Sequence, residues 1–283
     1  MIDKYLGQPI LNIMMKEFEM KNLKLLFAII IVNISNIYAE DMKPCEKNKV
    51  IYEDCKIEGW TPGDFRINNQ GRRFVGKMIN VIVKDSSMEG VLFEGPVLRN
   101  VQFIASTDGQ MNLRNAKFDI PLDNVRFGGR LSKTINMDGA YFGGRNGSTI
   151  GTLLMSGITV GDTKITFDKF ITHGILIITS SRIKKFEFIE GGYNTNLRIL
   201  NSNIEDISFE NTRRFLNAEF IGSILNLSMD RTQSEDKHIA FIGSTLRNSN
   251  IKYKNNITFQ DTNLSRATIN GKLCAEGSID ECK

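Results

Sequence analysis

The stretch that decides the fold is Val91-Leu92-Phe93-Glu94-Gly95-Pro96-Val97-Leu98-Arg99-Asn100-Val101-Gln102-Phe103. Its apolar side chains advance in alternating steps of two and three residues, at positions 91, 93, 96, 98, 101 and 103. A step of two is the period of a β-strand, in which alternate side chains share one face. An amphipathic helix would instead place its apolar residues three and four apart. We therefore predict short strands that are joined at corners.

The same five-residue period runs through much of the chain. A chain that turns a corner after each short strand closes into a coil, and coils stack about 4.8 Å apart through backbone hydrogen bonds. We therefore expect an all-β solenoid whose core is a column of Phe, Leu, Ile and Val side chains. The period includes Val83, Met88, Phe93, Leu98 and Phe103, and it returns, with interruptions, at Ile178, Ile183 and Phe188, at Ile199, Ile204 and Phe209, and at Phe259, Leu264 and Ile269.

This pattern resembles the pentapeptide-repeat family, whose motif is a small residue, Asp or Asn, Leu or Phe, and two polar residues. The closest matches are Asn115-Ala116-Lys117-Phe118, Thr262-Asn263-Leu264-Ser265-Arg266 and Ala267-Thr268-Ile269-Asn270-Gly271. The resemblance covers residues 74–273 and implies a right-handed quadrilateral β-helix of about ten coils, each of about twenty residues. We expect irregular loops around residues 128–168. A triangular β-helix is the structural alternative.

The beginning of the chain has the pattern of a secretory signal peptide. From Met20, a charged segment precedes an almost wholly apolar run at 25–32, and Ile-Tyr-Ala at 37–39 forms a cleavage site. The apolar run is too short for a membrane span, which needs about twenty residues. We predict that residues 20–39 are a cleaved signal peptide, with an uncleaved anchor as the alternative. Residues 1–19 are expected to reflect a misassigned start or a disordered extension.

The four cysteines lie at the two ends of the expected solenoid. Cys45 and Cys55 precede it, and Cys274 and Cys282 follow it. About ten coils separate the ends by tens of Å, whereas a disulfide needs Cα atoms within about 7 Å. We therefore expect the pairs Cys45–Cys55 and Cys274–Cys282, and no zinc site, because zinc would require the thiolates to lie together. The expected layout is an extension (1–19), a signal peptide (20–39), an N-terminal cap (40–73), the solenoid (74–273) and a C-terminal cap (274–283).

The chain carries few residues of the types that catalysis requires. Its 2 histidines, His173 and His238, lie far apart in the sequence, so a histidine-based triad or metal centre is not expected. Aspartates in the irregular central region could provide the acid pair of a glycosidase or lyase, but aspartate is also a common turn former. We predict no catalytic, cofactor-binding or metal-binding residue. The aspartates considered are Asp119, Asp123, Asp138, Asp162 and Asp168.

A repeated tetrapeptide provides the candidate ligand-binding residues, Arg130 and Arg145. Phe127-Gly128-Gly129-Arg130 and Phe142-Gly143-Gly144-Arg145 lie fifteen positions apart. Glycine-flexed corners could present the two arginines to an anionic ligand such as a glycan acid or a phosphate. Alternatively, the glycines form bulges at which the chain turns, and the arginines are solvent-exposed side chains that bind no ligand.

The charge balance limits the possible partners. The chain has 36 Lys and Arg against 32 Asp and Glu, a formal net charge of +4. This charge is too small to favour nucleic-acid binding. It also differs from the acidic surface of the DNA-mimicking topoisomerase inhibitors of the pentapeptide-repeat family, which remain an alternative.

We therefore expect an exported, periplasmic or extracellular, non-catalytic repeat protein that offers a binding or scaffolding surface to an unknown protein or glycan. A β-helical carbohydrate-active enzyme is the first alternative to this function. No cofactor, no nucleic acid and no stable membrane span after signal cleavage are expected.

Overall fold

The structure is a computed structural model, in which all strands belong to the second of two compact units, Met1–Lys43 and Pro44–Lys283. No helix in the described part of the chain is long and apolar enough to cross a membrane. The described residues are 42–64, 73–106, 109–129, 135–143, 149–161, 163–172, 175–193, 195–212, 215–231, 238–253 and 257–274.

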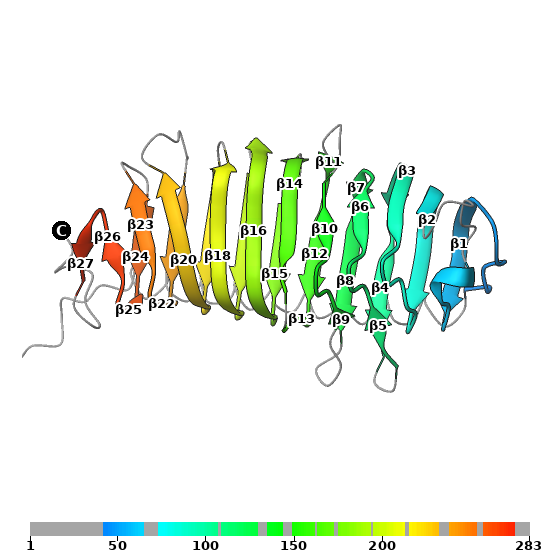
Figure 1. The fold of residues 1–283 in the computed structure, drawn as a ribbon, viewed down its shortest axis with the longest axis horizontal. Coiled ribbons are helices and arrows are strands. Elements are labelled where there is room, and N and C mark those ends of the chain that lie inside the picture. The colour runs from blue at the N-terminus through cyan, green and yellow to red at the C-terminus, as the bar shows by residue number, and fades with distance from the viewer. Residues whose placement is uncertain are drawn as a thin grey trace, which may run out of the picture. The chain divides into compact units, whose positions relative to one another are not determined.

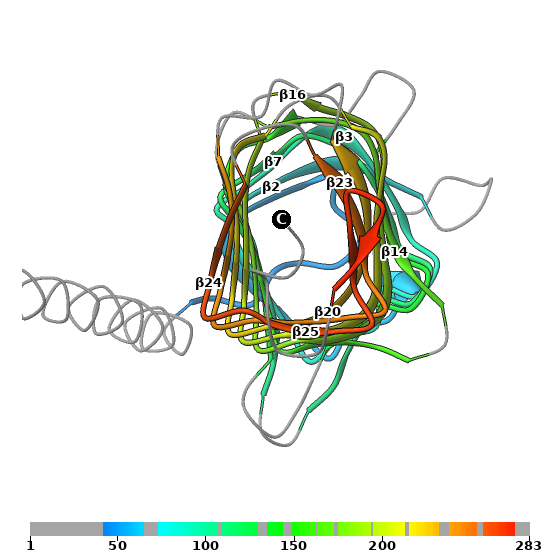
Figure 2. The ribbon, with the colours of Figure 1, turned by 90° about the vertical axis from the view of Figure 1, so that its left-hand side faces the viewer.

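The second unit is a β-solenoid with four faces, as expected (Figures 1 and 2). Seen with its C-terminal end toward the viewer, the chain turns counterclockwise from β24 through β25 to β26 while it approaches the viewer. This is the sense of a right-handed coil. The prediction of a quadrilateral β-helix is confirmed, and the triangular alternative is wrong. We call the faces A, B, C and D, in the order in which each coil passes through them.

Faces C and D contain most of the short strands. Face C consists of the second halves of β1 (Ile51–Glu58) and β2 (Arg73–Lys84), and of β4 (Gln102–Ala105), β8 (Val125–Gly129), β12 (Leu153–Ser156), β15 (Ile175–Thr179), β17 (Thr195–Leu200), β19 (Phe215–Ile221), β21 (Ile239–Ile242) and β24 (Ile257–Gln260). Face D consists of β5 (Met111–Asn112), β9 (Ile135–Asn136), β13 (Ile158–Val160), the first residues of β16 (Arg182–Tyr193), β18 (Asn203–Thr212) and β20 (Ile224–Arg231), and β22 (Thr245–Arg247) and β25 (Asn263–Ser265).

Faces A and B share several long strands that bend from one face to the next. Face A contains the first residues of β2, β3 (Leu92–Arg99) and β14 (Ile165–Thr172), later parts of β16, β18 and β20, and β6 (Lys117–Asp119), β10 (Tyr141–Phe142), β23 (Asn250–Tyr253) and β26 (Thr268–Ile269). Face B contains the remainder of these bent strands, with β7 (Leu122–Asp123) and β11 (Thr149–Ile150). A 3-10 helix, η1 (Pro62–Asp64), follows β1, and β27 (Lys272–Leu273) pairs with β26 in the antiparallel sense.

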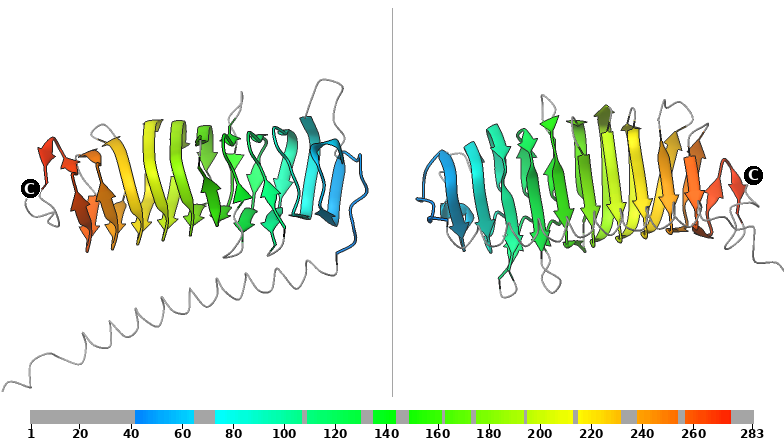
Figure 3. Two further views of the ribbon diagram at one scale, coloured as in Figure 1. Left: turned by 60° about the horizontal axis from the view of Figure 1, so that its bottom comes forward. Right: turned by 180° about the vertical axis from the view of Figure 1, so that it is seen from behind.

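The parallel pairings join equivalent positions of successive coils into columns, which extend along the solenoid (Figure 3). On face C, Ile178, Ile199, Phe220 and Phe241 follow one another at intervals of 21 residues. Coils nearer the N-terminus vary in length, from 20 residues between Val83 and Phe103 to 28 residues between Phe127 and Met155. The regular twenty-residue coil is therefore wrong, and the chain makes fewer complete turns than the ten expected. The solenoid also begins earlier than expected, because β1 within the predicted cap already pairs with β2.

Phenylalanine rings form the interior of face A. Phe93, Phe118, Phe142 and Phe167 are fully buried, and consecutive ring centroids lie 4.8, 4.8 and 4.6 Å apart with nearly parallel planes. This distance equals the spacing of neighbouring strands. Parallel pairing in register therefore stacks the rings without any adjustment of the backbone.

Most coils turn their corners at single residues in the left-handed conformation. Asn80, Asn100 and Asn124 have φ of 53°, 51° and 53° between faces B and C. Asparagine adopts this conformation at lower cost than most residues. The side-chain amides also form a ladder, in which Asn100 donates to Asn80 and Asn124 donates to Asn100, each at 2.9 Å. The three-residue step of the sequence, from Leu98 to Val101, spans this corner.

Buried serines line the beginning of face D in the C-terminal coils. The backbone N–H groups of Ser181, Ser202 and Ser223 each donate to the hydroxyl of the serine one coil further along, at 3.2 Å. Each hydroxyl donates in turn to the carbonyl two residues before it, as Ser181 does to Thr179 at 2.8 Å. The corner backbone thus keeps its hydrogen bonds inside the protein, as burial requires.

The disulfide at the N-terminal end is confirmed. Cys45 and Cys55 are bonded, with Cα atoms 5.1 Å apart. Trp60 is buried there and contacts Tyr52 edge to face at 5.8 Å. Cys274 is disulfide-bonded, but its expected partner Cys282 lies outside the described residues.

We predict that Phe118→Ala destabilises the solenoid by about 3–5 kcal/mol, because it leaves a cavity in the ring column. Thermal or urea unfolding followed by circular dichroism measures this change. Val75→Ala, at a side chain that is 43% exposed, is the control and should cost less than about 0.5 kcal/mol. Equal effects of the two substitutions would contradict the assigned role of the ring column.

Candidate functional site

The four described aspartates among those considered as an acid pair lie on three different faces. On face B, Asp123 accepts a hydrogen bond from Arg99 Nε at 3.0 Å. On face D, Asp138 is 7% exposed and accepts the backbone N–H groups of Gly161 at 3.0 Å and Thr163 at 3.3 Å. Asp123 and Asp138 therefore stabilise the coil, and neither converges on a partner acid.

Asp119 and Asp168 are the two aspartates that share a face. Both point outward from face A, in one row with Gly143, which lies between them on the intervening coil. A Cβ atom on Gly143 would lie 2.2 Å from the backbone oxygen of Asp168, so only glycine fits here. Two coil spacings separate the aspartates at the backbone, about 10 Å. The glycine places no side chain between the two carboxylates.

Tyr141, one row away, completes this cluster. Its hydroxyl donates to Asp168 Oδ2 at 2.6 Å. Burial raises the pKa of Tyr141, and the hydrogen bond to Asp168 and the charges of Asp168 and Asp119 raise it further. The phenol therefore stays neutral, and its hydroxyl group continues to donate a hydrogen bond to Asp168. We call Asp119, Tyr141, Gly143 and Asp168 the tyrosine patch.

Neighbouring carboxylates on face A are neutralised by basic side chains. Glu187 accepts from Lys164 at 2.6 Å and forms an ion pair with Lys185 at 2.8 Å, and Arg73 pairs with Glu94. Burial opposes ionisation of Glu187, but the two lysines outweigh it and lower the pKa of this carboxyl group. Asp119 differs, since no described residue forms a hydrogen bond or ion pair with it. Within the tyrosine patch, the Asp168 carboxylate therefore accepts a hydrogen bond from Tyr141, whereas the Asp119 carboxylate accepts none from a described residue.

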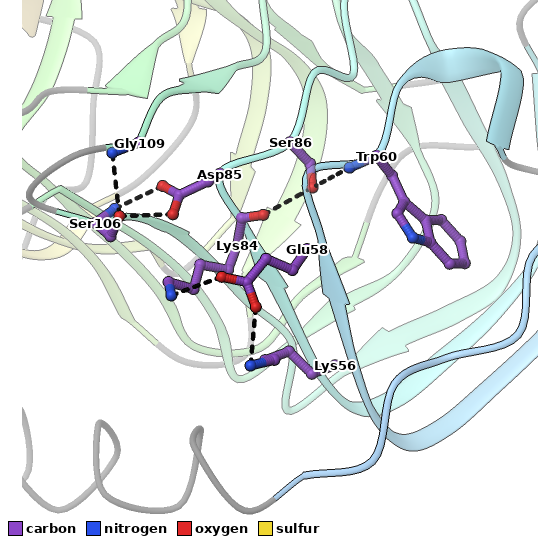
Figure 4. A network of polar contacts seen from close by, with 8 residues as sticks. All are labelled: Lys56, Glu58, Trp60, Lys84, Asp85, Ser86, Ser106 and Gly109. Carbon is purple, nitrogen blue, oxygen red and sulfur yellow. Dashed lines mark hydrogen bonds and ion pairs between the residues drawn. The ribbon is translucent and has the colours of Figure 1, made fainter.

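A second polar network joins the first coils near the N-terminal end (Figure 4). Lys84 and Lys56 hold Glu58 at 2.7 and 2.9 Å and lower the pKa of its carboxyl group. Asp85 accepts the backbone N–H and the hydroxyl of Ser106, at 2.7 and 2.6 Å. This network anchors a loop between coils, and its polar groups are used within the protein.

The same network also forms a hydrogen bond with the segment that follows β1. Ser86 accepts the backbone N–H of Trp60 at 3.1 Å and donates to the carbonyl of Lys84 at 2.8 Å. Gly109 donates to Ser106 at 3.1 Å, and a Cβ atom on it would lie 1.9 Å from the Asp85 carboxyl carbon. These polar groups therefore bond to one another within the protein.

Several residues singled out from the sequence cannot be placed. Arg130 and Arg145, the candidate ligand-binding arginines, lie outside the described residues, as do Asp162 and His173. His238 is described, and its backbone carbonyl accepts the N–H of Ala218 at 2.9 Å. Within the described ranges, no group of three or more His, Cys, Asp or Glu could hold a metal ion.

Sequence reasoning missed Tyr141, although a signal for it was present. The triplets Lys117-Phe118-Asp119, Tyr141-Phe142-Gly143 and Thr166-Phe167-Asp168 share a central phenylalanine that points into the core. Aligning them on this ring places the tyrosine between lysine and threonine, and the glycine between two aspartates. The uneven intervals between the triplets hide this alignment from a strict five-residue period.

No protein-family model, no curated protein and no solved structure matches this chain.

We predict that Asp168→Asn lowers the pKa of Tyr141 toward its ordinary value of 10.0, because the substitution removes the adjacent negative charge. An alkaline titration of tyrosinate absorbance measures this, with Tyr141→Phe used to subtract the other tyrosines. A raised pKa favours the neutral phenol in the folded protein, so this contribution to stability is present below about pH 10 and is lost above the raised value. An unchanged titration in Asp168→Asn would rule out the assigned cause.

Proposed function

We propose that this chain is an exported, non-catalytic β-solenoid that acts as a binding or scaffolding surface in the cell envelope or outside the cell. We further propose that it is a divergent relative of the pentapeptide-repeat family. The five-residue period and the four-faced right-handed coil support this relationship, whereas the 21-residue coils depart from the family's regular length.

Two features support export. The sequence from residue 20 to residue 39 has the three parts of a secretory signal peptide. The Cys45–Cys55 disulfide closes a short loop at the N-terminal end, and such bonds persist mainly in oxidising compartments. Together they favour the periplasm or the cell exterior.

The observation that carries the binding function is the tyrosine patch. Asp119 is half-buried and has no partner among the described residues, and Gly143 adds no side chain between Asp119 and Asp168. The strands beneath are fixed by the ring column, so a ligand would meet acceptors that are already positioned. Two carboxylates suit the hydroxyl groups of neutral glycans and the ammonium groups of amino sugars. They disfavour the acidic ligands considered for Arg130 and Arg145.

A carbohydrate-active enzyme is the second candidate, and the same patch favours it. Asp119 and Asp168 lie about 10 Å apart at the backbone, close to the carboxyl separation of about 6.5–9.5 Å in inverting glycosidases. However, the Asp168 carboxylate is held in a hydrogen bond by Tyr141. No described basic residue forms an ion pair with Asp119 or Asp168. We therefore favour binding without catalysis.

We predict that the native protein is recovered outside the cytoplasm as a chain beginning at Glu40, and that its mass rises by four hydrogens on reduction, since two disulfides open. Cell fractionation followed by intact-mass analysis measures both. A cytoplasmic chain that retains residues 1–39 and has four free thiols would overturn the proposed export.

We predict that the chain binds oligomers of glucosamine, N-acetylglucosamine or neutral hexoses, and that Asp119→Asn weakens binding about tenfold or more, because a hydrogen bond to a charged group is lost. Calorimetric titration measures this, with Asp123→Asn on face B as the matched control. Equal losses in both variants, or no binding by the native chain, would refute the tyrosine patch as a binding site. New reducing ends that disappear in Asp119→Asn would establish the enzyme instead.

A further inference from the structure

Thr166 is a buried polar side chain beside the tyrosine patch. Eight polar or charged side chains are buried among the described residues, and seven of them, six serines and Asp138, form hydrogen bonds within the protein. Thr166 is 6% exposed, and its hydroxyl forms no hydrogen bond with a described residue. In the described ranges, Gln102 Oε1 is the only fully buried side-chain polar atom without a partner. The Thr166 hydroxyl therefore reaches the surface, where a ligand can meet it.

The pairing of β10 with β14 places this hydroxyl next to the Tyr141 ring. Tyr141 lies opposite Thr166, and Gly143 lies opposite Asp168. The four positions are the corners of a rectangle of about 4.8 Å by about 6.6 Å, one strand spacing by two residue rises. The Tyr141 hydroxyl reaches Asp168 Oδ2 at 2.6 Å, across the diagonal of this rectangle. The ring therefore crosses the rectangle between Thr166 and a glycine that has no side chain.

The Tyr141 ring differs from the phenylalanine rings beneath it. It is partly exposed, and no described aromatic ring stacks on it. A tyrosine side chain has an apolar body and a polar tip. Because Asp168 already holds the tip, the body of the ring is the part that can pack against a ligand.

Polar groups of complementary kinds surround the ring. Lys117 is exposed and lies on the other side of Tyr141 from Thr166. No described residue forms a hydrogen bond or an ion pair with the ammonium group of Lys117. The carboxylates of Asp119 and Asp168 supply acceptors, Lys117 supplies donors, and the Thr166 hydroxyl can donate or accept.

We propose that the tyrosine patch binds a neutral hexose unit of a glycan, whose ring packs on Tyr141 and whose hydroxyl groups bond to Thr166 and Asp119. A hexose ring carries apolar C–H groups on its faces and hydroxyl groups around its edge. Hydroxyl groups both donate and accept, so they suit a site that offers acceptors and donors together. This ligand class narrows the proposed binding function, on which it rests.

The same groups disfavour an amino sugar. An ammonium group only donates, so it cannot accept a hydrogen bond from Lys117 or Thr166. Lys117 also carries the same charge as the ammonium group, and like charges that face each other in a complex are unfavourable. We therefore expect the patch to prefer a neutral hexose to the corresponding amino sugar.

Two probes of equal length and linkage test this preference. The β-1,4-linked tetramers of glucose and of glucosamine differ in each unit by a hydroxyl in place of an ammonium group. Calorimetric titration of the full-length protein at about pH 5.5, where amines are protonated and aspartates ionised, should show about fivefold or more tighter binding of the glucose tetramer.

The outcomes separate this ligand class from the binding function. Equal or tighter binding of the glucosamine tetramer would overturn the neutral-hexose proposal but leave the binding function intact. No binding of either tetramer would also overturn the proposal, and it would refute the binding function as well if oligomers of N-acetylglucosamine failed to bind.

A substitution at Thr166 tests the contact itself. Thr166→Val keeps the branched shape and removes the hydroxyl, so it should weaken binding of the glucose tetramer about fivefold. Thr159→Val on face D is the matched control and should bind like the native chain, while Thr166→Ser should bind more tightly than Thr166→Val. Thermal unfolding followed by circular dichroism checks each fold. Equal binding by the two valine variants, or by Thr166→Val and Thr166→Ser, would overturn the proposed contact.

A charge reversal at Lys117 tests the selectivity. Lys117→Glu should shift the preference about tenfold or more toward the glucosamine tetramer, because an ammonium group then meets a third carboxylate instead of a cation. Arg182→Glu, at an exposed position of face D, makes the same change of net charge and should leave the preference as it is. No shift in Lys117→Glu, or an equal shift in Arg182→Glu, would overturn the proposed selectivity.

Discussion

The structure depends on the parallel pairing of equivalent strands in register. This pairing sets one spacing, about 4.8 Å, for the backbone and for the side chains that the backbone carries. The rings of Phe118 and Phe142 stack at 4.8 Å, so hydrogen bonding and aromatic packing are satisfied by the same geometry. In the N-terminal half, rings of face A also contact those of face C edge to face, as Phe118 contacts Phe127 at 5.5 Å. Each coil is therefore held both to its neighbours and across the interior.

The corners make this pairing possible because they absorb the change of direction within single residues. Asn100 turns the chain with φ of 51° and also bonds to its neighbours in the ladder. The serines of face D perform the equivalent task inside the corner, where Ser202 receives a backbone N–H and returns a hydrogen bond to a carbonyl. Because the corners carry their own hydrogen bonds, coils of different length can stack in register.

A core of this kind leaves the four outer faces independent of one another. Every second residue of a strand points outward, so the outer rows can vary without disturbing the ring column. Face A carries charges that are mostly paired and the tyrosine patch, face D carries polar side chains, and face C carries aliphatic side chains such as Ile177 and Leu200.

The sequence by itself determined the solenoid, because the alternation at Val101 and Phe103 and the three-residue step across Asn100 are local properties of the chain. It also determined the Cys45–Cys55 pair, since neighbouring cysteines at one end of a solenoid can reach only each other. Coil length and the first coil at β1 were decided by tertiary structure, because insertions at corners shift the register without changing the period inside each strand. The candidate sites depended on the same register. It brings Asp119 and Asp168 to either side of Gly143 and separates them from Asp123 and Asp138, and no local pattern records which residues meet after a full turn.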